Sequence, residues 1–197
     1  MTEEIRVRTA TSADEDNVIS SLVLAFAMDP MIRWFYKTPT QFLGHFPDFI
    51  RIYGGKGFDA EGVHYVGDFT GTAVWLPPGV QPDEEEFVGH IADTVDSSLM
   101  DDFFAVFEEL QDYQVEEPHW HLPFIGVTPR HQRRGYGSAM MEKVVAECDR
   151  TQTIAALEST NPANLSLYLR YGFEIEAAIQ AGTSPPLFPM VRQPQSR

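Results

Sequence analysis

The stretch from His119 to Arg150 constrains the fold more than any other part of the chain, because its pattern changes from strand to helix across a basic turn. His119 to Val127 is rich in aromatic and branched residues, which predicts a buried strand. From Gly135 onward, apolar residues recur at every fourth position, which predicts a helix with one apolar face. We therefore expect a strand, a short turn and a helix in direct succession.

The turn between these two elements is suited to bind a diphosphate. It carries Arg130, Arg133 and Arg134, although no lysine or arginine occurs between Lys56 and Arg130. The first amides of a helix have no internal partner and point outward with a partial positive charge, and Gly135 has no Cβ to keep an oxyanion away from them. A solvated turn that is basic by chance is the simpler alternative, and the glycines argue against it.

The run Gln132-Arg133-Arg134-Gly135-Tyr136-Gly137 resembles the Gln/Arg-x-x-Gly-x-Gly/Ala signature of the GNAT superfamily, the acyl-CoA-dependent N-acetyltransferases. The resemblance implies that the turn binds the pyrophosphate of acetyl-CoA and that the preceding strand presents its backbone to the pantetheine arm. The acetyl-CoA contacts implied in this way are Ile125, Gly126, Val127, Gln132, Arg133, Arg134, Gly135, Tyr136, Gly137, Ser138 and Asn164. A P-loop would need a terminal Gly-Lys-Ser/Thr, and a dinucleotide fingerprint would need a third glycine.

The segment from Asn161 to Phe173 resembles the second signature of the same family, which contains an asparagine, a tyrosine and a Gly-Phe pair. The matching tyrosine is Tyr168, and the resemblance implies that it gives a proton to the departing thiolate. Asn164 lies one turn earlier on the same helix face, where the family binds pantetheine or orients the tyrosine. The simpler alternative is that Tyr168 is only a core aromatic residue.

The candidate base is His121, which lies 14 residues before Gly135, where histone-type members of the family carry a glutamate. We expect His121 to project to the same side of its strand as Pro123 and Ile125. A histidine has a reference pKa of about 6.5, so it can accept a proton near neutral pH. Glu158 and a bound water are alternative bases, and a merely structural histidine is the simpler interpretation. No third ligand at a telling spacing supports a metal site.

Pro123 breaks the rules for a central strand, because proline cannot donate to the ladder, and it therefore predicts a bulge. In the resembling family the fourth strand is bulged and diverges from the fifth, which leaves a slot for pantetheine. The resemblance thus implies an α/β fold with a mixed sheet of six to seven strands, a splay between the fourth and fifth, and flanking helices. Strand amides in that slot would polarise the thioester.

The remaining pattern supplies the other elements of such a sheet. Strands are expected at about 5–8, 63–66, 70–76, 153–157, 173–178 and 187–192, with a tight Gly67-Asp68 hairpin. Helices are expected after a Ser12–Glu15 capping box, at 40–53 with a kink or break at Pro47, and at 161–171. Trp75 to Gly79 resembles a segment of puromycin N-acetyltransferase-like members. With the loop Met31 to Tyr36, it hints at a flat or apolar acceptor through four rings: Trp34, Phe35, Tyr36 and Trp75.

Length and composition favour one domain over 1–197, with an acidic helical insertion at about 81–117 and a disordered tail at about 193–197. The net charge of −15 argues against nucleic acid, and no apolar run reaches the length of a membrane helix. The charged N-terminus lacks the core of a signal peptide, so a cytoplasmic location is expected. Cys148 is the single cysteine, so an internal disulfide is excluded, and we expect this residue in the core.

These observations together predict an N-acetyltransferase that moves an acetyl group from acetyl-CoA to a primary amine of a small molecule by direct attack in a ternary complex. A protein amine as acceptor, a non-catalytic acyl-CoA sensor and an acidic scaffold for basic proteins stay open as alternatives. The acidic segment either draws a cationic amine or serves solubility alone. The identity of the acceptor and the question of a homodimer also stay open.

Overall fold

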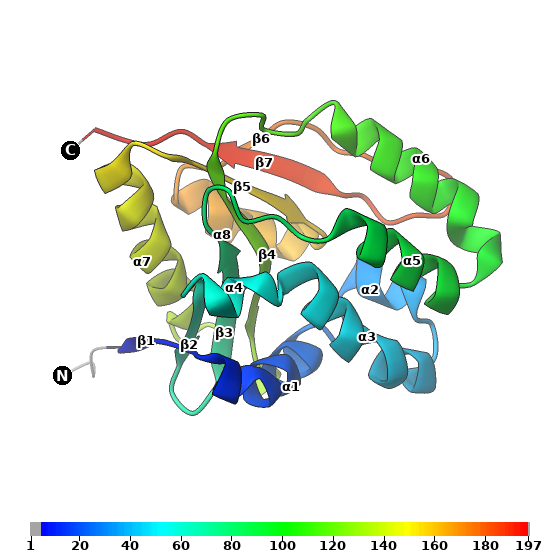
Figure 1. Cartoon of the computed structure of the whole chain (residues 1–197), viewed down its shortest axis with the longest axis horizontal. Helices are drawn as coiled ribbons and strands as arrows, with labels where there is room; N and C mark the ends of the chain where they lie inside the picture. Colours follow the sequence, from blue (N-terminus) through cyan, green and yellow to red (C-terminus); the bar gives the residue numbers. More distant parts are fainter. Residues whose placement is uncertain (1–4, 197) are drawn as a thin grey trace.

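A seven-stranded mixed sheet organises the chain in the computed structural model, which describes residues 5–196 (Figure 1). The strands are β1 Val7–Thr9, β2 Val63–Val66, β3 Gly71–Leu76, β4 His119–Val127, β5 Ile154–Ser159, β6 Glu174–Ile175 and β7 Phe188–Arg192. Their order across the sheet is β1-β2-β3-β4-β5-β7-β6, and only the β4–β5 pair is parallel. The expected α/β fold with six to seven mixed strands is confirmed.

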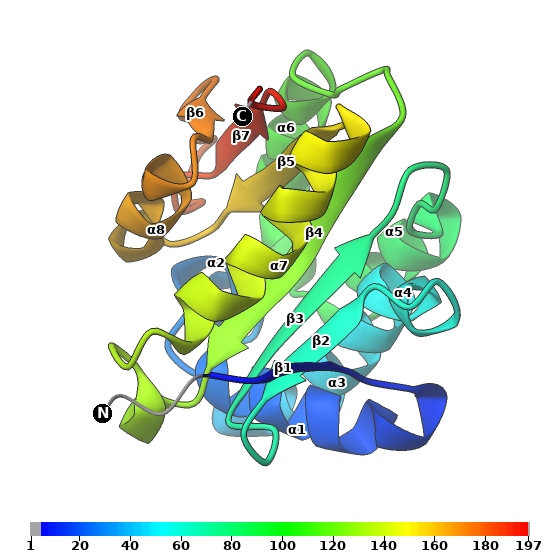
Figure 2. The same cartoon turned by 90° about the vertical axis from the view of Figure 1, so that its left-hand side faces the viewer.

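Helices cover both faces of this sheet. Figure 2 shows α7 (Tyr136–Thr151) across one face, while α1 (Glu15–Ala25) and α3 (Pro39–Gly54) lie behind the other. The remaining helical segments are η1 Ser12–Asp14, α2 Pro30–Phe35, α4 Lys56–Asp59, α5 Glu84–Thr94, η2 Ser97–Leu99, α6 Met100–Gln111, η3 Pro129–His131, η4 Pro162–Asn164 and α8 Leu165–Arg170. Within residues 5–196, every helix is too short or too polar to span a membrane.

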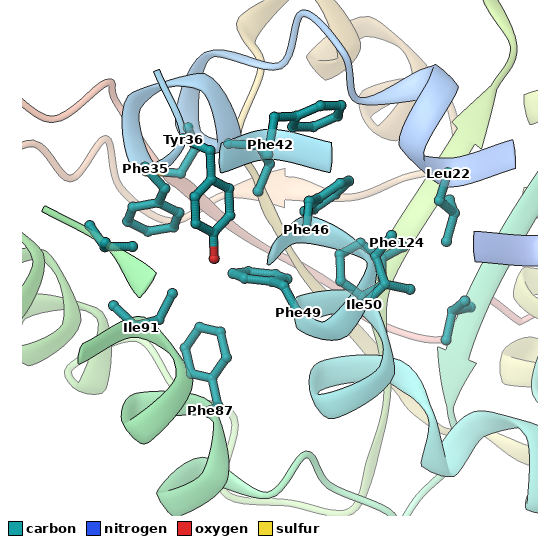
Figure 3. Close-up of a cluster of buried hydrophobic side chains, with 14 of the residues drawn as sticks. Leu22, Phe35, Tyr36, Phe42, Phe46, Phe49, Ile50, Phe87, Ile91 and Phe124 are labelled. Carbon is teal, nitrogen blue, oxygen red and sulfur yellow. The ribbon is translucent and has the colours of Figure 1, made fainter. Parts of the chain in front are cut away.

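The two faces bury different kinds of side chain. The face toward α1 and α3 buries phenylalanines that α2, α3 and α5 contribute, among them Phe35, Phe49 and Phe87 (Figure 3). The face under α7 buries mainly aliphatic and sulfur side chains, including Cys148, which is fully buried as expected. Burial raises the pKa of the Cys148 thiol to about 12, so this cysteine is a core residue.

The β4–β5 pairing ends where Pro123 begins to disturb β4. The two strands pair only from His119–Ile154 to His121–Ala156. On the other edge of β4, the partners are Val74–Phe124 and Leu76–His121, so β4 carries one residue more than β3 in this interval. The predicted bulge at Pro123 and the splay of β4 from β5 are both confirmed, and a proline that cannot donate to the ladder explains them.

The bulge also reverses the alternation of side chains along β4. Leu122 and Ile125 both pack in the cluster under α7, whereas Phe124 packs in the aromatic cluster on the opposite face. The ring of Tyr53 contacts both His121 and Phe124, with centroids 5.9 Å and 6.1 Å apart. The prediction that His121 shares a side with Ile125 was therefore wrong, because the inserted residue shifts the period of two.

Four local predictions need correction, each for a specific reason. The capping box joins Thr11 to Asp14, one residue earlier than expected. The turn between β2 and β3 spans 67–70, since both Gly67 and Phe69 adopt positive φ. The segment after α1 is the helix α2, because the Asp29 side chain accepts hydrogen bonds from two amides of its first turn. Helix α3 continues through Pro47, so the predicted break is absent.

Candidate active site

The turn before α7 has the backbone geometry of an anion cradle. Arg133 and Gly135 adopt left-handed φ values of 60° and 85°, which for Gly135 carries no Cβ penalty. The first internal bond of the helix joins the Ala139 amide to the Gly135 carbonyl at 2.9 Å, so the amides before Ala139 have no helical partner. The first turn of α7 contains no acidic residue, and Arg133 and Arg134 are exposed beside it. The turn fits a diphosphate.

The helix of the second motif is attached directly to this turn. The Tyr171 hydroxyl, just after α8, donates a 2.8 Å hydrogen bond to the Ser138 carbonyl in the first turn of α7. A Cβ at Gly137 would lie 3.5 Å from Leu167 of α8, so the two helices approach closely there. The fold thus brings the 132–138 turn and the 161–173 segment together, although β5 separates them in sequence.

A cavity of about 140 Å³ lies in the splay between β4 and β5. Its lining includes Ile125 from β4 and both Asn164 and Tyr168 from the α8 region, which were expected at the pantetheine and at the leaving thiolate. Gly126 and Val127 continue β4 toward the turn, and a Cβ at Gly126 would lie only 2.5 Å from Ala25 of α1. Of the residues expected from the two motifs, Ile125, Asn164 and Tyr168 line this cavity, whereas Gly126, Val127 and the 132–138 turn lie outside its lining.

A second cavity of about 260 Å³ adjoins the first, and Glu158 lines both of them. His121 lines only the second cavity. Three further carboxylates line it, those of Glu84, Glu116 and Glu117. Three exposed glutamates of the predicted acidic insertion therefore lie along the second cavity.

The two candidate bases form a pair. His121 Nε2 lies 2.8 Å from Glu158 Oε2, and their side chains are only 13% and 27% exposed. Burial acts to raise the pKa of Glu158, but the charge and hydrogen bond of His121 outweigh it and hold that pKa below its usual value. A carboxylate that stays ionised accepts a hydrogen bond from the Nε2–H of His121, which leaves Nδ1 as the nitrogen that can accept a proton.

Tyr168 is 6% exposed, and its ring packs 6.3 Å from that of Phe173. Burial, with a smaller contribution from the charge of Asp29, raises the pKa of Tyr168, so its hydroxyl keeps the proton over the physiological range. Asp29 is itself buried: Oδ1 caps α2, and Oδ2 accepts a 2.7 Å hydrogen bond from Thr160 at the end of β5. Asp29 thus ties α2 to the strand that carries Glu158.

An aromatic wall completes the first cavity, and sequence reasoning identified it only in part. Trp34 and Phe35 line the cavity as suggested, together with Phe49, Tyr53, Phe87, Phe103 and Phe107. Tyr36 and Trp75 do not line it. Tyr36 is buried with its hydroxyl 3.1 Å from Thr94, and Trp75 is fully buried under α7. The sequence predicted only an acidic helical insertion at about 81–117, and it could not show that phenylalanines of this segment line a cavity.

The described residues, 5–196, contain no group of three or more His, Cys, Asp or Glu side chains arranged to hold a metal ion. The side chains of His121, Glu158 and Tyr168 can transfer protons or form hydrogen bonds, and the amides of the turn before α7 can bind an anion.

Comparison with known proteins agrees with this geometry. The model of the acetyltransferase (GNAT) family matches residues 53–173. An uncharacterized N-acetyltransferase of Schizosaccharomyces pombe is 26% identical over 146 residues, which cover 66% of this chain and 59% of the yeast protein. The chain therefore spans less than two thirds of that relative.

Solved structures share the fold over nearly the whole chain. The crystal structure of histone acetyltransferase HPA2 and related acetyltransferase from Corynebacterium glutamicum has a TM-score of 0.71 at 22% identity, with 99% of each chain covered. Arylalkylamine N-acetyltransferase 2 from Aedes aegypti has a TM-score of 0.67 at 14% identity, covering 98% of this chain and all of that one. At these identities the likeness establishes the fold.

Proposed function

Because the chain belongs to the acetyltransferase (GNAT) family, whose model matches more than half of its length, we propose that this acyltransferase moves an acetyl group from acetyl-CoA to a primary amine of a small molecule. The observation that carries the proposal is the His121–Glu158 pair, which lies where two cavities meet beside the splayed strands. Membership of the family implies acetyl-CoA as the acetyl donor. The His121–Glu158 pair provides a group that can accept a proton from the amine.

The backbone is arranged to hold acetyl-CoA. The amides around Gly135 and the exposed Arg133 and Arg134 would bind the diphosphate, and the free edge of β4 at 125–127 would pair with the pantetheine amides. Gln132 supports that edge, because its amide nitrogen donates to the Val127 carbonyl at 3.2 Å. When bound, acetyl-CoA supplies an acetyl thioester, whose carbonyl a β4 amide would polarise.

The amine must lose a proton, because an alkylammonium with a pKa of roughly 10 has no lone pair with which to attack. His121 Nδ1 takes this proton, and Glu158 stabilises the resulting imidazolium through Nε2. The new C–N bond forms as the C–S bond breaks, and the electron pair of the latter goes to sulfur; the nitrogen then loses its second proton to solvent, and the thiolate takes up one proton. His121 then returns the proton to solvent.

Tyr168 acts on the departing sulfur. Tyr168 lines the same cavity as Ile125 and Asn164, and burial holds its hydroxyl in the protonated form. A thiol has a pKa of about 8.5, well below that of this phenol, so Tyr168 stabilises the developing thiolate chiefly as a hydrogen-bond donor. When Tyr168 transfers its proton to the sulfur, the hydroxyl takes another proton from solvent.

The two cavities that meet at Glu158, of about 140 Å³ and 260 Å³, are of a size that suits a small molecule as the acceptor. The arylalkylamine N-acetyltransferase with the same fold is named for small amines, whereas the Corynebacterium structure is described as a histone acetyltransferase. Tyr53 and Phe87, whose ring centroids are 4.8 Å apart, line both cavities and place aromatic surface beside Glu158.

The test is a thiol-release assay on the full chain with acetyl-CoA and three classes of amine: monoamines, polyamines and lysine peptides. Turnover with small amines that exceeds turnover with peptides supports the proposal. A preference for lysine peptides would replace it with protein acetylation. Calorimetric binding of coenzyme A without turnover for any amine would replace it with a non-catalytic acyl-CoA sensor.

A further inference from the structure

The first cavity carries an aromatic wall that acetyl transfer alone does not require. Rings from four helices meet in it, with centroids 5.2 Å apart for Phe49 and Phe87 and 6.0 Å apart for Phe35 and Phe103. Figure 3 shows Phe35, Phe49 and Phe87 converging from α2, α3 and α5. Edge-to-face contacts of this kind accept another ring at little cost, because the side chains are already ordered.

The volume of the cavity matches one aromatic ring. It measures about 140 Å³, and an apolar protein cavity of about 150 Å³ binds benzene. The space suits a compact ring that carries a short arm.

The charge around the cavity suits a single ammonium group. Glu158 is the one charged side chain among the described residues that line it. A second ammonium on the guest would lie among rings without a counter-ion, which is strongly unfavourable. The other carboxylates, Glu84, Glu116 and Glu117, line the neighbouring cavity, on the far side of Tyr53 and Phe87.

From the wall, the volume and the lone carboxylate, we infer that the acceptor is an arylalkylamine with one primary amine and one ring. This inference rests on the function proposed above. The amine pairs with Glu158, beside His121, and the ring packs against Phe103 and Phe107 of α6. Aliphatic diamines and lysine side chains fit the same site less well.

The first experiment compares acceptors at fixed acetyl-CoA. We expect kcat/KM for 2-phenylethylamine to exceed that for 1,4-diaminobutane and for a lysine peptide at least tenfold. We also expect 2-phenylethylamine, and not the diamine, to release heat when titrated into the complex of the protein with coenzyme A. This binding measurement does not depend on turnover.

The second experiment changes the wall. Phe103→Leu removes a ring from the cavity but keeps an apolar side chain, so we expect kcat/KM for 2-phenylethylamine to fall at least fivefold while KM for acetyl-CoA stays constant. Phe104→Leu is the matched control, since Phe104 is the next residue of α6, is 47% exposed and does not line the cavity. Phe107→Leu repeats the test at a half-buried position if Phe103→Leu fails to fold.

Several outcomes would overturn the inference. A preference for the diamine or the peptide would do so and leave acetyl transfer to amines intact. Faster turnover with hexanoyl-CoA than with acetyl-CoA would assign the aromatic wall to the acyl chain of the donor. The absence of thiol release with every amine would remove the proposed function, and this inference with it.

Discussion

Oδ2 of Asp102 accepts two hydrogen bonds from Thr183, one from its amide and one from its hydroxyl, each 2.8 Å long. The same hydroxyl accepts a 3.1 Å hydrogen bond from the indole nitrogen of Trp34. Asp102 thereby connects α6 to the segment before β7 and to α2. Since Phe103 follows Asp102 directly and lines the cavity, this connection fixes one side of the aromatic wall.

Replacing Asp102 with alanine should therefore affect the acceptor and not the donor. We expect KM for the amine to rise several-fold while KM for acetyl-CoA is unchanged, because α6 loses its attachment to Thr183. Asp101→Ala, an exposed change of the same charge one residue earlier, is the control. Gly182→Ala should reproduce the defect, since Gly182 has φ +52° and its Cβ would collide with Asp102. An equal rise of both KM values would show a general loss of folding instead.

The basic turn should determine the affinity for coenzyme A. Arg133→Glu or Arg134→Glu replaces an exposed cation beside the Gly135 amides with an anion, so we expect binding to weaken tenfold or more and to become less sensitive to salt. Calorimetry with coenzyme A measures this directly. Lys56→Glu, an equal change of charge at an exposed site on α4, should leave the affinity within twofold. Unchanged binding in both arginine variants would remove the turn from the diphosphate site.

Loss of the Tyr168 hydroxyl should slow turnover without weakening the donor complex. Tyr168→Phe preserves the packing against Phe173, so we expect kcat to fall about 100-fold, the lower part of the range for acid–base groups, with little change in KM for acetyl-CoA. Tyr171→Phe is the control on stability, because its hydroxyl bonds the Ser138 carbonyl and has no proposed chemical role. Equal kcat in Tyr168→Phe and the wild type would exclude Tyr168 from the mechanism.

The His121–Glu158 pair should act as one unit. Glu158→Gln and His121→Gln should each lower kcat about tenfold or more, and the double variant should be little worse than either, because each change disables the same proton acceptor. His119→Gln, on the same strand, is the control and should stay within twofold. Since the pKa of Glu158 is held below its usual value, its stabilising charge is present above about pH 4.5 and is lost as the pH falls through the lowered pKa. Additive losses would indicate separate roles.

Features that depend on local backbone geometry could be predicted from the sequence. The turn at Gly135 before a helix, a helical segment that begins near Asn161 and the bulge at Pro123 were all predicted, because each of these residues has few alternatives in its context. The mixed sheet and the splay between its fourth and fifth strands followed from the resemblance to a known family. These predictions required only neighbouring residues or a familiar fold.

The aromatic wall and the His121–Glu158 contact depend on distances between remote segments, and the sequence could not supply them. Phe49, Phe87 and Phe103 come from three helices that pack together only after α5 and α6 fold back over the sheet. The bulge at Pro123 was predicted. Its consequence is that the side chains of His121 and Phe124 lie on the same face, and this could be recognised only from the register of β4 with β3. Proton acceptors were thus predicted one by one, and their pairing was not.

A histidine outside the site should control stability in acid. His64 on β2 is 4% exposed, and its Nδ1 lies 3.5 Å from the Thr9 hydroxyl. Burial, and then the charge of Lys143, lower the pKa of His64 to about 4 from 6.5. Between these values the unfolded chain binds a proton that the folded chain does not.

The contribution of His64 to the free energy of unfolding should therefore be largest above pH 6.5, and it should fall as the pH drops from 6.5 toward 4. A shift of this size corresponds to about 3 kcal/mol. His64→Asn keeps a polar atom at the δ position but does not titrate, so the difference in stability between the wild type and this variant should shrink by that amount across the window. Urea unfolding at pH 7, 6, 5 and 4 measures it, and His131→Asn, at a half-buried site before α7, is the control. A difference independent of pH would mean that His64 already accepts its proton in the folded chain.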